Sequence, residues 1–418
     1  MKDGLPAAYP ALKRDERCEV AVIGAGITGA LVAWHLVEAG IDTVVLDRRD
    51  VAHGSTSGST SLLQYEIDLP LHRLAQRLGP GRAERAYHGC LQSIHDLARL
   101  IKRLKIDCGF EYKGSLFLAS KRADVTPLRR EYEARLAAGF DVAWWPRGEV
   151  ARRTNLPQPA AIFSAPGEAA QVDAYALTHG LLAAAAKKGA RIYDRTGVRR
   201  TARHARGIEL ATQRGARVRA KWLVVASGYE ADQFLPECVT TLHSTYAIAS
   251  EPVEDFSGWP EGEPVIWDTA NPYIYLRTTP DRRIIMGGYD EPFRDPVRRD
   301  RLLTAKAALL QRRFHQLLPR IPFELATAWA GTFGKTDDGL PFIGEYPGMP
   351  RTWFALGYGG NGITYSMIAA QLLRDRLTEG VAGNADLYGF DRKPGPEGHF
   401  PASIHDQRTP SRPKSEHD

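Results

Sequence analysis

The spacing of apolar residues in the first fifty positions predicts a strand, a helix and a second strand in succession. Residues 20–23 (VAVI) form an apolar run of strand length. From residue 27 to Gly40 the apolar positions follow a helical period, with one face formed by Ile27, Ala30, Leu31, Trp34 and Val37. A second apolar run, residues 44–46, ends at Asp47. Between the first strand and the helix, the glycines follow the order G-x-G-x-x-G at Gly24, Gly26 and Gly29.

Each glycine of this turn has a physical purpose in binding a dinucleotide. The first permits a tight strand-to-helix turn, the second lets a pyrophosphate approach the backbone, and the third lets helix and strand pack closely. The helix N-terminus offers unpaired N–H groups and about half a positive charge to the phosphates. Asp47 is placed to accept hydrogen bonds from both ribose hydroxyls of an adenosine. The pattern predicts a dinucleotide site and leaves the dinucleotide open; a glycine-rich turn without a ligand is the alternative.

A hydroxyl-rich segment of small residues, GSTSGSTS, follows at positions 54–61. One interpretation is a flexible surface loop. The other is a second loop facing the phosphates, because small residues let the backbone approach a ligand and hydroxyls donate to it. The position directly after the second strand favours the second interpretation. A hydrolase nucleophile elbow is not predicted, because Thr56 stands at the centre of the G-x-x-x-G spacing, where that motif requires serine.

The remaining chain alternates predicted helices and strands. Helices are predicted over residues 81–105, from Thr126 as N-cap with Pro127 first, over 173–189 and over 295–318. Strands are predicted at 111–119, 191–193, 222–226, 246–249, 273–277 and 283–286, with a hairpin turning near residues 214–215. The run 222–226 is apolar throughout, which is typical of a sheet covered by helices. A change in composition at 235–240 indicates entry into a second domain.

Two glycine-rich motifs mark the last third of the chain. They are GTFGKTDDGLPFIG at residues 331–344 and LGYGGNGIT at 356–364. The second leads into a helix predicted to run to about residue 377 and to end at Gly380. Glycines directly before a helix imply that backbone lies against a ligand. Beyond residue 392 the prolines and charges predict a disordered tail, residues 393–418.

Composition limits the possible functions without choosing among them. The chain has 418 residues, of which 43% are hydrophobic, enough for one large core or two moderate ones. A net charge of +6 with mixed signs gives no nucleic-acid-binding character. Four widely spaced cysteines predict neither a disulfide framework nor a metal site and fit a reducing compartment. No stretch has the length of a secretory leader core or a transmembrane segment, so we expect a cytoplasmic protein.

Together the motifs resemble the D-amino-acid oxidase family of FAD-dependent oxidoreductases, in the branch of glycine oxidase, sarcosine oxidase and gamma-glutamylputrescine oxidase. The matching stretches are VAVIGAGITGALVAWHLVEAG with VVLD, WLVVASGYEA, GTFGKTDDGLPFIG and LGYGGNGITYS, spanning residues 19 to about 377. The first stretch alone would also match NAD enzymes. The resemblance implies an α/β plus α+β fold: a Rossmann-like FAD-binding domain discontinuous in sequence (residues 19–64, 155–240 and 325–392), and a substrate domain with an antiparallel sheet (65–154 and 241–324).

The resemblance also implies where FAD binds. The segment matching residues 331–333 contains no cysteine, so the FAD is expected to be non-covalent. The helix start after the second glycine-rich motif is expected to stabilise the negative charge that reduction places at flavin N1 and C2=O. Carried over by motif, the cofactor-binding residues are Gly24, Gly26, Ile27, Thr28, Gly29, Asp47, Arg48, Ser57, Thr60, Ser61, Leu62, Val198, Ala226, Ser227, Gly228, Gly359, Gly360, Asn361, Gly362, Ile363 and Thr364.

The implied activity is oxidation of the C–N bond of an amino acid or secondary amine, with hydride transfer to flavin N5 and hydrolysis of the imine. Oxygen or another acceptor would take the electrons. Sarcosine-oxidase-like members place an oxygen-activating lysine in the strand matching residues 283–286, where this chain has Ile285. A dehydrogenase of the same family is therefore one alternative. A non-catalytic flavoprotein and an NAD-only dehydrogenase are the others.

Three residues are candidates for the chemistry at the substrate. Tyr273, Tyr275 and Arg277 alternate along a strand and should point the same way. Glycine-oxidase-like members grip the substrate carboxylate with an arginine in a similar strand, so Arg277, with Tyr275 beside it, is the hypothesis for substrate anchoring. Such a charge-assisted bond contributes about 1.5–3 kcal/mol; a surface salt bridge is the alternative. Lys335 is the third candidate, either near flavin N5 or paired with Asp337 or Asp338.

Overall fold

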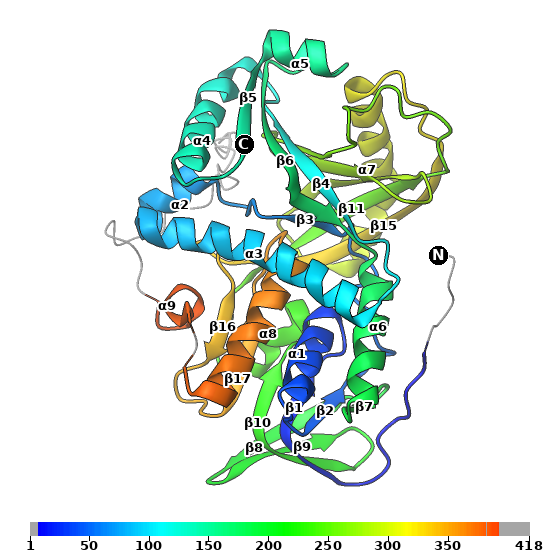
Figure 1. Cartoon of the computed structure of the whole chain (residues 1–418). Helices are drawn as coiled ribbons and strands as arrows, with labels where there is room; N and C mark the ends of the chain where they lie inside the picture. Colours follow the sequence, from blue (N-terminus) through cyan, green and yellow to red (C-terminus); the bar gives the residue numbers. More distant parts are fainter. Residues whose placement is uncertain (1–6, 382, 393–418) are drawn as a thin grey trace, which may run out of the picture.

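A computed structural model describes residues 7–381 and 383–392, which form two sheets with helices between and around them (Figure 1). The first sheet has eight strands in the order β16-β17-β10-β1-β2-β7, and the β8–β9 hairpin extends it from β10. Neighbours from β17 through to β7 are parallel, whereas β16 runs antiparallel to β17. Its strands are β1 (Glu16–Ile23), β2 (Thr43–Leu46), β7 (Arg191–Tyr193), β8 (Val198–His204), β9 (Gly207–Thr212), β10 (Arg217–Val225), β16 (Phe342–Glu345) and β17 (Thr352–Leu356).

Three helices lie side by side on one face of this sheet: α1 (Ile27–Glu38), α6 (Ala174–Lys187) and α8 (Gly362–Glu379) (Figure 1). Val20 and Val22 of β1 point into the core that these helices cover. Ala21 and Ile23, which alternate with them, belong to a second core on the opposite face, shared with the β8–β9 hairpin. The run 222–226, predicted to be apolar on both faces, is divided in the same way, with Val224 in the first core and Leu223 and Val225 in the second, although the hairpin and not α-helices covers the second face.

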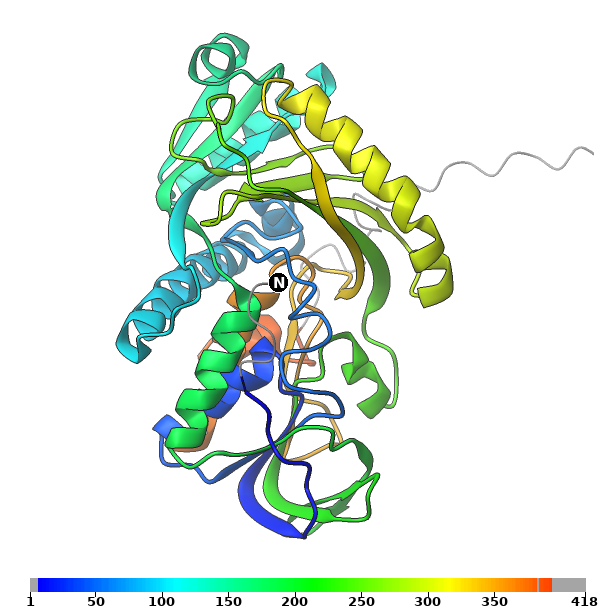
Figure 2. The same ribbon diagram turned by 90° about the vertical axis from the view of Figure 1, so that its right-hand side faces the viewer.

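The second sheet has nine strands and is mainly antiparallel, with β15-β11-β14-β13-β12-β4-β6-β3 as its order and β5 paired to β6. The helix α7 (Pro296–Leu317) covers one face of it (Figure 2), with Leu310 and Phe314 in the shared core. Its strands are β3 (Leu62–Gln64), β4 (Glu111–Leu118), β5 (Val142–Pro146), β6 (Ala160–Gln171), β11 (Thr241–Ser250), β12 (Val265–Asp268), β13 (Ile274–Thr278), β14 (Ile284–Glu291) and β15 (Leu325–Lys335).

The other helices close the space beside and between the two sheets. The longest, α3 (Pro80–Leu104), lies between them in Figure 1. The others are α2 (Leu71–Leu78), α4 (Val125–Ala137), α5 (Arg147–Arg153), α9 (Ala385–Tyr388) and the 3₁₀ turns η1 (Arg122–Asp124) and η2 (Gly228–Phe234). Among these helices and those already named, none has the length and apolar character needed to cross a membrane.

Several sequence predictions need correction. The helix expected to begin after Thr126 starts at Val125, continuing directly from η1, so Thr126 is not its N-cap. The elements α2, β5, α5 and β6 were not predicted, because they are short or mix small and apolar residues. Three strands, β3, β6 and β15, belong to the nine-stranded sheet, whereas the expected boundaries assign them to the FAD-binding domain. The division into two domains stays a prediction, and the expected tail, residues 393–418, lies outside the described residues.

Candidate active site

A continuous cavity of about 810 Å³ extends from the N-terminus of α1 to the nine-stranded sheet. This volume lies within the range that small-molecule and cofactor sites occupy. It is lined by residues from both sheets and from the loops that join them. The predicted cofactor residues all line it except Gly29, Ser57 and Thr364.

The glycine-rich turn has the close contacts that its spacing predicts. Gly24 adopts a φ of +106°, and a Cβ there would lie 2.4 Å from the carbonyl oxygen of Ala226. A Cβ on Gly29 would lie 1.8 Å from the carbonyl oxygen of Gly24, which is why Gly29 packs helix against strand and does not face the cavity. A Cβ on Gly26 would lie 2.9 Å from Thr56 Oγ1, and both residues line the cavity. At Gly24 and Gly29 the contact is with backbone, so a larger residue does not fit unless the turn shifts, whereas at Gly26 the contact is with the Thr56 side chain.

Asp47 is held in place at the end of β2. Its Oδ2 accepts a hydrogen bond from the Ala25 N–H at 2.7 Å, and its Oδ1 accepts one from the Arg49 N–H at 2.8 Å. Burial raises the pKa of this carboxyl, although both backbone bonds oppose that shift. Nearby, Glu230 pairs with Arg48 and with Arg49. The carboxylate therefore lies in the cavity wall with a fixed orientation.

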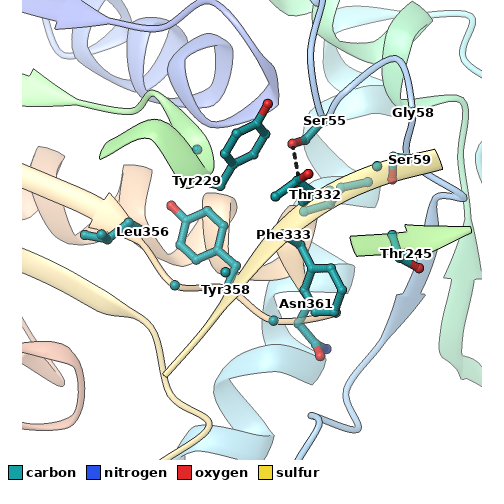
Figure 3. A pocket seen from close by; sticks show the side chains of 18 of the residues that line it. Ser55, Gly58, Ser59, Tyr229, Thr245, Thr332, Phe333, Leu356, Tyr358 and Asn361 are labelled. Carbon is teal, nitrogen blue, oxygen red and sulfur yellow. Dashed lines mark hydrogen bonds between the residues drawn. The ribbon is translucent and has the colours of Figure 1, made fainter. Parts of the chain in front are cut away.

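The hydroxyl-rich segment lies against the N-terminus of α1. Thr56 Oγ1 accepts a hydrogen bond from the Ile27 N–H at 3.0 Å. Ser57 does not line the cavity, because its Oγ turns back to donate to the Gly54 carbonyl. Ser55 Oγ donates to the Thr332 carbonyl at 3.5 Å, and this bond joins the loop to β15 (Figure 3).

The start of α8 is tied to β3. Asn361 Nδ2 donates to the carbonyls of Gln64 at 3.0 Å and of Glu66 at 2.9 Å. Thr364 is buried within α8, where its Oγ1 donates to the Asn361 carbonyl. Consequently the glycine-rich start of α8 faces the cavity, whereas Thr364 supports it from behind.

Two hydroxyl groups in the cavity wall are buried without a hydrogen-bond partner among the described residues, those of Ser227 and Tyr358. Buried polar groups are nearly always paired, and because the Tyr358 hydroxyl also lies near those of Thr28 and Ser366, the Ser227 hydroxyl is the one that indicates a polar ligand. Figure 3 shows the ring of Tyr358 beside that of Tyr229, with the Phe333 side chain next to Asn361. A polar ligand with a flat aromatic part fits this wall.

At the far end of the cavity lie Tyr275 of β13 and Tyr273, directly before that strand, with their ring centroids 5.9 Å apart. Arg277 shares the strand of Tyr275 but does not line the cavity. Its Nε donates to the Thr60 carbonyl at 2.6 Å, and its Nη1 donates to the Thr278 carbonyl at 3.1 Å. Burial lowers the pKa of Arg277 to about 10. Its role as the substrate anchor stays a prediction.

Lys335, at the end of β15, also lies behind the cavity wall and not in it. Its Nζ is 5.7 Å from the ring centroid of Tyr273 and 5.1 Å from that of Phe333, both of which line the cavity. Asp338, one of its two predicted partners, instead forms an ion pair with Arg392 at 2.6 Å. The structure thus places Lys335 beside Tyr273, and a role near flavin N5 stays a prediction.

Sequence reasoning missed a buried charged cluster in the wall, formed by Glu66, Arg135 and Glu131. Arg135 Nε lies 2.7 Å from Glu131 Oε1, and Arg135 Nη1 lies 3.1 Å from Glu66 Oε1, with all three side chains at most 1% exposed. Burial alone would raise the pKa of Glu131, but Arg135 and the bonds from His72 lower it to about 2. The spacing of Glu131 and Arg135, four residues apart on one helix, was the available signal.

A model of the FAD dependent oxidoreductase (DAO) family matches residues 19–376. The chain belongs to this family. It is therefore an FAD-dependent oxidoreductase. Its sequence is 28% identical over 387 residues to glycine oxidase from Geobacillus kaustophilus, covering 90% of this chain and 96% of that protein. It is 25% identical over 394 residues to gamma-glutamylputrescine oxidoreductase from Escherichia coli, covering 91% and 88%.

Solved structures show that this DAO-family chain has the family fold. The structure of glycine oxidase from Geobacillus kaustophilus superimposes with a TM-score of 0.75 at 22% identity, covering 90% of this chain and 99% of that one. L-proline dehydrogenase from P. horikoshii superimposes with a TM-score of 0.74 at 19% identity, covering 90% and 97%. At these identities the likeness concerns the fold, which combines a mainly parallel sheet with a mainly antiparallel one, as expected.

Proposed function

We propose that this FAD-dependent oxidoreductase oxidises a C–N bond in an amine or amino acid and leaves an imine that water hydrolyses. The observation that supports it most is the continuous cavity, which joins the dinucleotide motif at Gly24 to the tyrosine-bearing strand β13. The relatives named above are glycine oxidase and gamma-glutamylputrescine oxidoreductase, whose named compounds both contain C–N bonds.

The residues that would hold FAD follow from the geometry of the wall. Asp47 would accept from the ribose, the backbone at Gly26 and Ile27 would face the pyrophosphate, and the start of α8 at Gly360 would face the pyrimidine edge of the flavin. When bound, FAD supplies a hydride acceptor at flavin N5.

Tyr273 and Tyr275 would orient the amine. Burial raises the pKa of Tyr275 to about 12 and, with the charges of Asp290 and Asp68, raises that of Tyr273 further. Both hydroxyls therefore stay protonated at neutral pH and can donate to, or accept from, a substrate amine. No strong base is needed in the wall when the amine binds in its neutral form.

An absorbance spectrum of the purified protein, followed by an anaerobic screen of amines and amino acids, tests this function. We expect a flavin spectrum that is bleached by at least one compound. A flavin that no compound of the screen reduces would contradict the proposal and favour a non-catalytic flavoprotein. A protein that neither carries nor takes up FAD would contradict the cofactor assignment.

The electron acceptor is a separate question. Oxygen is one candidate, and a dehydrogenase reaction with another acceptor is the second. The second is favoured by β14, which has Ile285 paired with Arg277 across the sheet and carries no lysine. Oxygen consumption measured during turnover, compared with reduction of an artificial quinone, separates the two: oxygen uptake that matches substrate loss excludes the dehydrogenase.

A further inference from the structure

The arginines that line the cavity differ in whether the guanidinium already forms an ion pair or a hydrogen bond with another residue. Arg48 and Arg49 both pair with Glu230. Arg299 pairs with Asp300 and donates to Thr332 Oγ1 at 3.1 Å. Arg73 has no hydrogen bond or ion pair from its side chain to any part of the chain that the structure describes. Its guanidinium is thus the cationic group of the lining arginines that is available to a ligand.

Arg73 lies at the solvent end of the cavity. It is on α2 and is exposed, whereas its neighbours Leu71 and Leu74 are buried beneath the helix. Arg77, one helical turn further, donates from Nη1 to the Asp337 carbonyl at 2.6 Å, and the charges of Asp338 and Asp337 oppose the lowering of its pKa by burial. The charge of Arg77 is thus engaged with these aspartates, and Arg73 is the arginine at this edge that lines the cavity.

Carboxylates that line the cavity also differ in whether an arginine pairs with them. Glu66 and Glu131 are paired with Arg135, and Asp268 is paired with Arg313 at 3.0 Å. Asp68, in contrast, has no cationic partner within the described residues and accepts only the Gly360 N–H, at 3.2 Å. Asp68 lines the cavity together with Tyr273 and Tyr275, and its charge helps to raise the pKa of both tyrosines, after burial and the charge of Asp290.

We propose that Arg73 binds an acidic group of the substrate at the cavity entrance, so that the substrate is an amine carrying a carboxylate remote from the C–N bond that reacts. The amine end faces Tyr273, Tyr275 and the unpaired Asp68, and the acidic end faces solvent. This inference rests on the proposed function and names the substrate class of the same site. It also assigns the carboxylate to Arg73 and leaves Arg277 to hold the Thr60 carbonyl.

A series of N-methyl amino acids with increasing chain length tests the proposal in the FAD-loaded protein. The probes are the N-methyl derivatives of glycine, 4-aminobutyrate and 6-aminohexanoate, each compared with the N-methylalkylamine that lacks the carboxylate. Two quantities are measured: the perturbation of the flavin spectrum on binding and the rate of anaerobic bleaching. We expect a longer carboxylated member to bind about tenfold more tightly than its uncharged counterpart, as one charge-assisted bond provides.

Variants at three positions identify the arginine responsible. Arg73→Ala is expected to abolish the tenfold preference while leaving binding of the uncharged amines unchanged. Gln76→Ala, on the same helix, exposed and outside the cavity wall, is the matched control and is expected to keep it. Arg277→Leu is expected to keep the preference as well, provided that the variant retains FAD.

The outcomes separate this inference from the proposed function. A carboxylate preference that survives in Arg73→Ala, or that disappears in Arg277→Leu with FAD retained, overturns the assignment to Arg73. Absence of any preference in the unmodified protein overturns the substrate class. If carboxylated probes bind in an Arg73-dependent way but never bleach the flavin, the inference stands and the proposed oxidation fails.

Discussion

Replacing Arg135 by methionine should strongly destabilise this protein, because it would leave two buried carboxylates without their shared cation. The side chain of Arg135 is 0% exposed and contacts Glu131 and Glu66 at 2.7 and 3.1 Å. Its guanidinium also lies within 6 Å of the rings of Tyr65 and Phe117. Methionine preserves apolar contact with these rings but removes the charge.

The magnitude follows from what remains around each carboxylate. Glu131 keeps the N–H groups of Leu71 and His72, whereas Glu66 keeps a long bond from the Ser164 hydroxyl, at 3.4 Å, and burial raises the pKa of this carboxyl even with Arg135 beside it. Breaking a buried ion pair by removing one partner costs about 3–5 kcal/mol. We expect the free energy of unfolding, from urea titrations followed by tryptophan fluorescence, to fall by about that amount, with most of the loss arising at Glu66.

Two further variants make this test decisive. Arg130→Met changes an exposed residue of the same helix and should alter stability by less than about 0.5 kcal/mol. Adding Glu66→Gln to Arg135→Met should recover part of the loss, since a buried amide costs less than a buried carboxylate. If Arg135→Met lost less than about 1 kcal/mol, or if the second change restored nothing, the argument from stranded charge would be refuted.

Three other predictions concern the cofactor turn, the cluster and a helix cap. Gly24→Ala should lose FAD on dialysis, checked by the flavin-to-protein absorbance ratio, because the new Cβ would lie 2.4 Å from the Ala226 carbonyl. Because Glu131 has a pKa of about 2 in place of 4.5, its stabilisation is complete above pH 4.5 and is lost as pH falls toward 2; the difference of 4.5 − 2 corresponds to about 3 kcal/mol. Urea titrations between pH 3 and 6 should show this slope, and Glu131→Gln should lack it. Asp295→Ala should cost about 1 kcal/mol by thermal unfolding, because Asp295 accepts the N–H groups of Val297 and Arg298, while Asp300→Ala should be nearly neutral.

Local sequence patterns predicted the turns and helix ends, because these features depend on residues close together in the sequence. The turn at Gly24, the cap at Asp173 and the closing glycine Gly380 each depend on a few neighbouring residues, and the structure has them where expected. The charged cluster in contrast depends on residues that are distant in the sequence. Glu66 and Arg135 are 69 residues apart, and they meet only in the folded chain. Their cluster could not be found from spacing, apart from the Glu131–Arg135 pair within one helix.

Arg277 shows the limit of strand periodicity as a guide to function. Alternation places a side chain on a face of a sheet, and Arg277 does lie on the face that carries Tyr275. Alternation does not determine how far the side chain reaches or which acceptor is nearest. Here Nε donates to the Thr60 carbonyl and Arg277 does not line the cavity, while its role at the substrate stays a prediction. An exposed arginine on a short helix, Arg73, gave no comparable signal.

The segment of residues 54–73 lines the cavity at several points and is held by α1, by the start of α8 and by the nine-stranded sheet. Its beginning, at Thr56, is fixed to α1, and Gly58 accepts a hydrogen bond from Trp329 Nε1 on β15 at 2.9 Å. Arg277 on β13 donates a hydrogen bond to the Thr60 carbonyl. Asn361, the N-cap of α8, donates to the carbonyls of Gln64 and Glu66. The same segment leads into α2, which carries Arg73, so the expected cofactor contacts and the proposed substrate contact lie on one continuous stretch of chain. This connection gives the buried Arg277 a purpose that does not require contact with substrate.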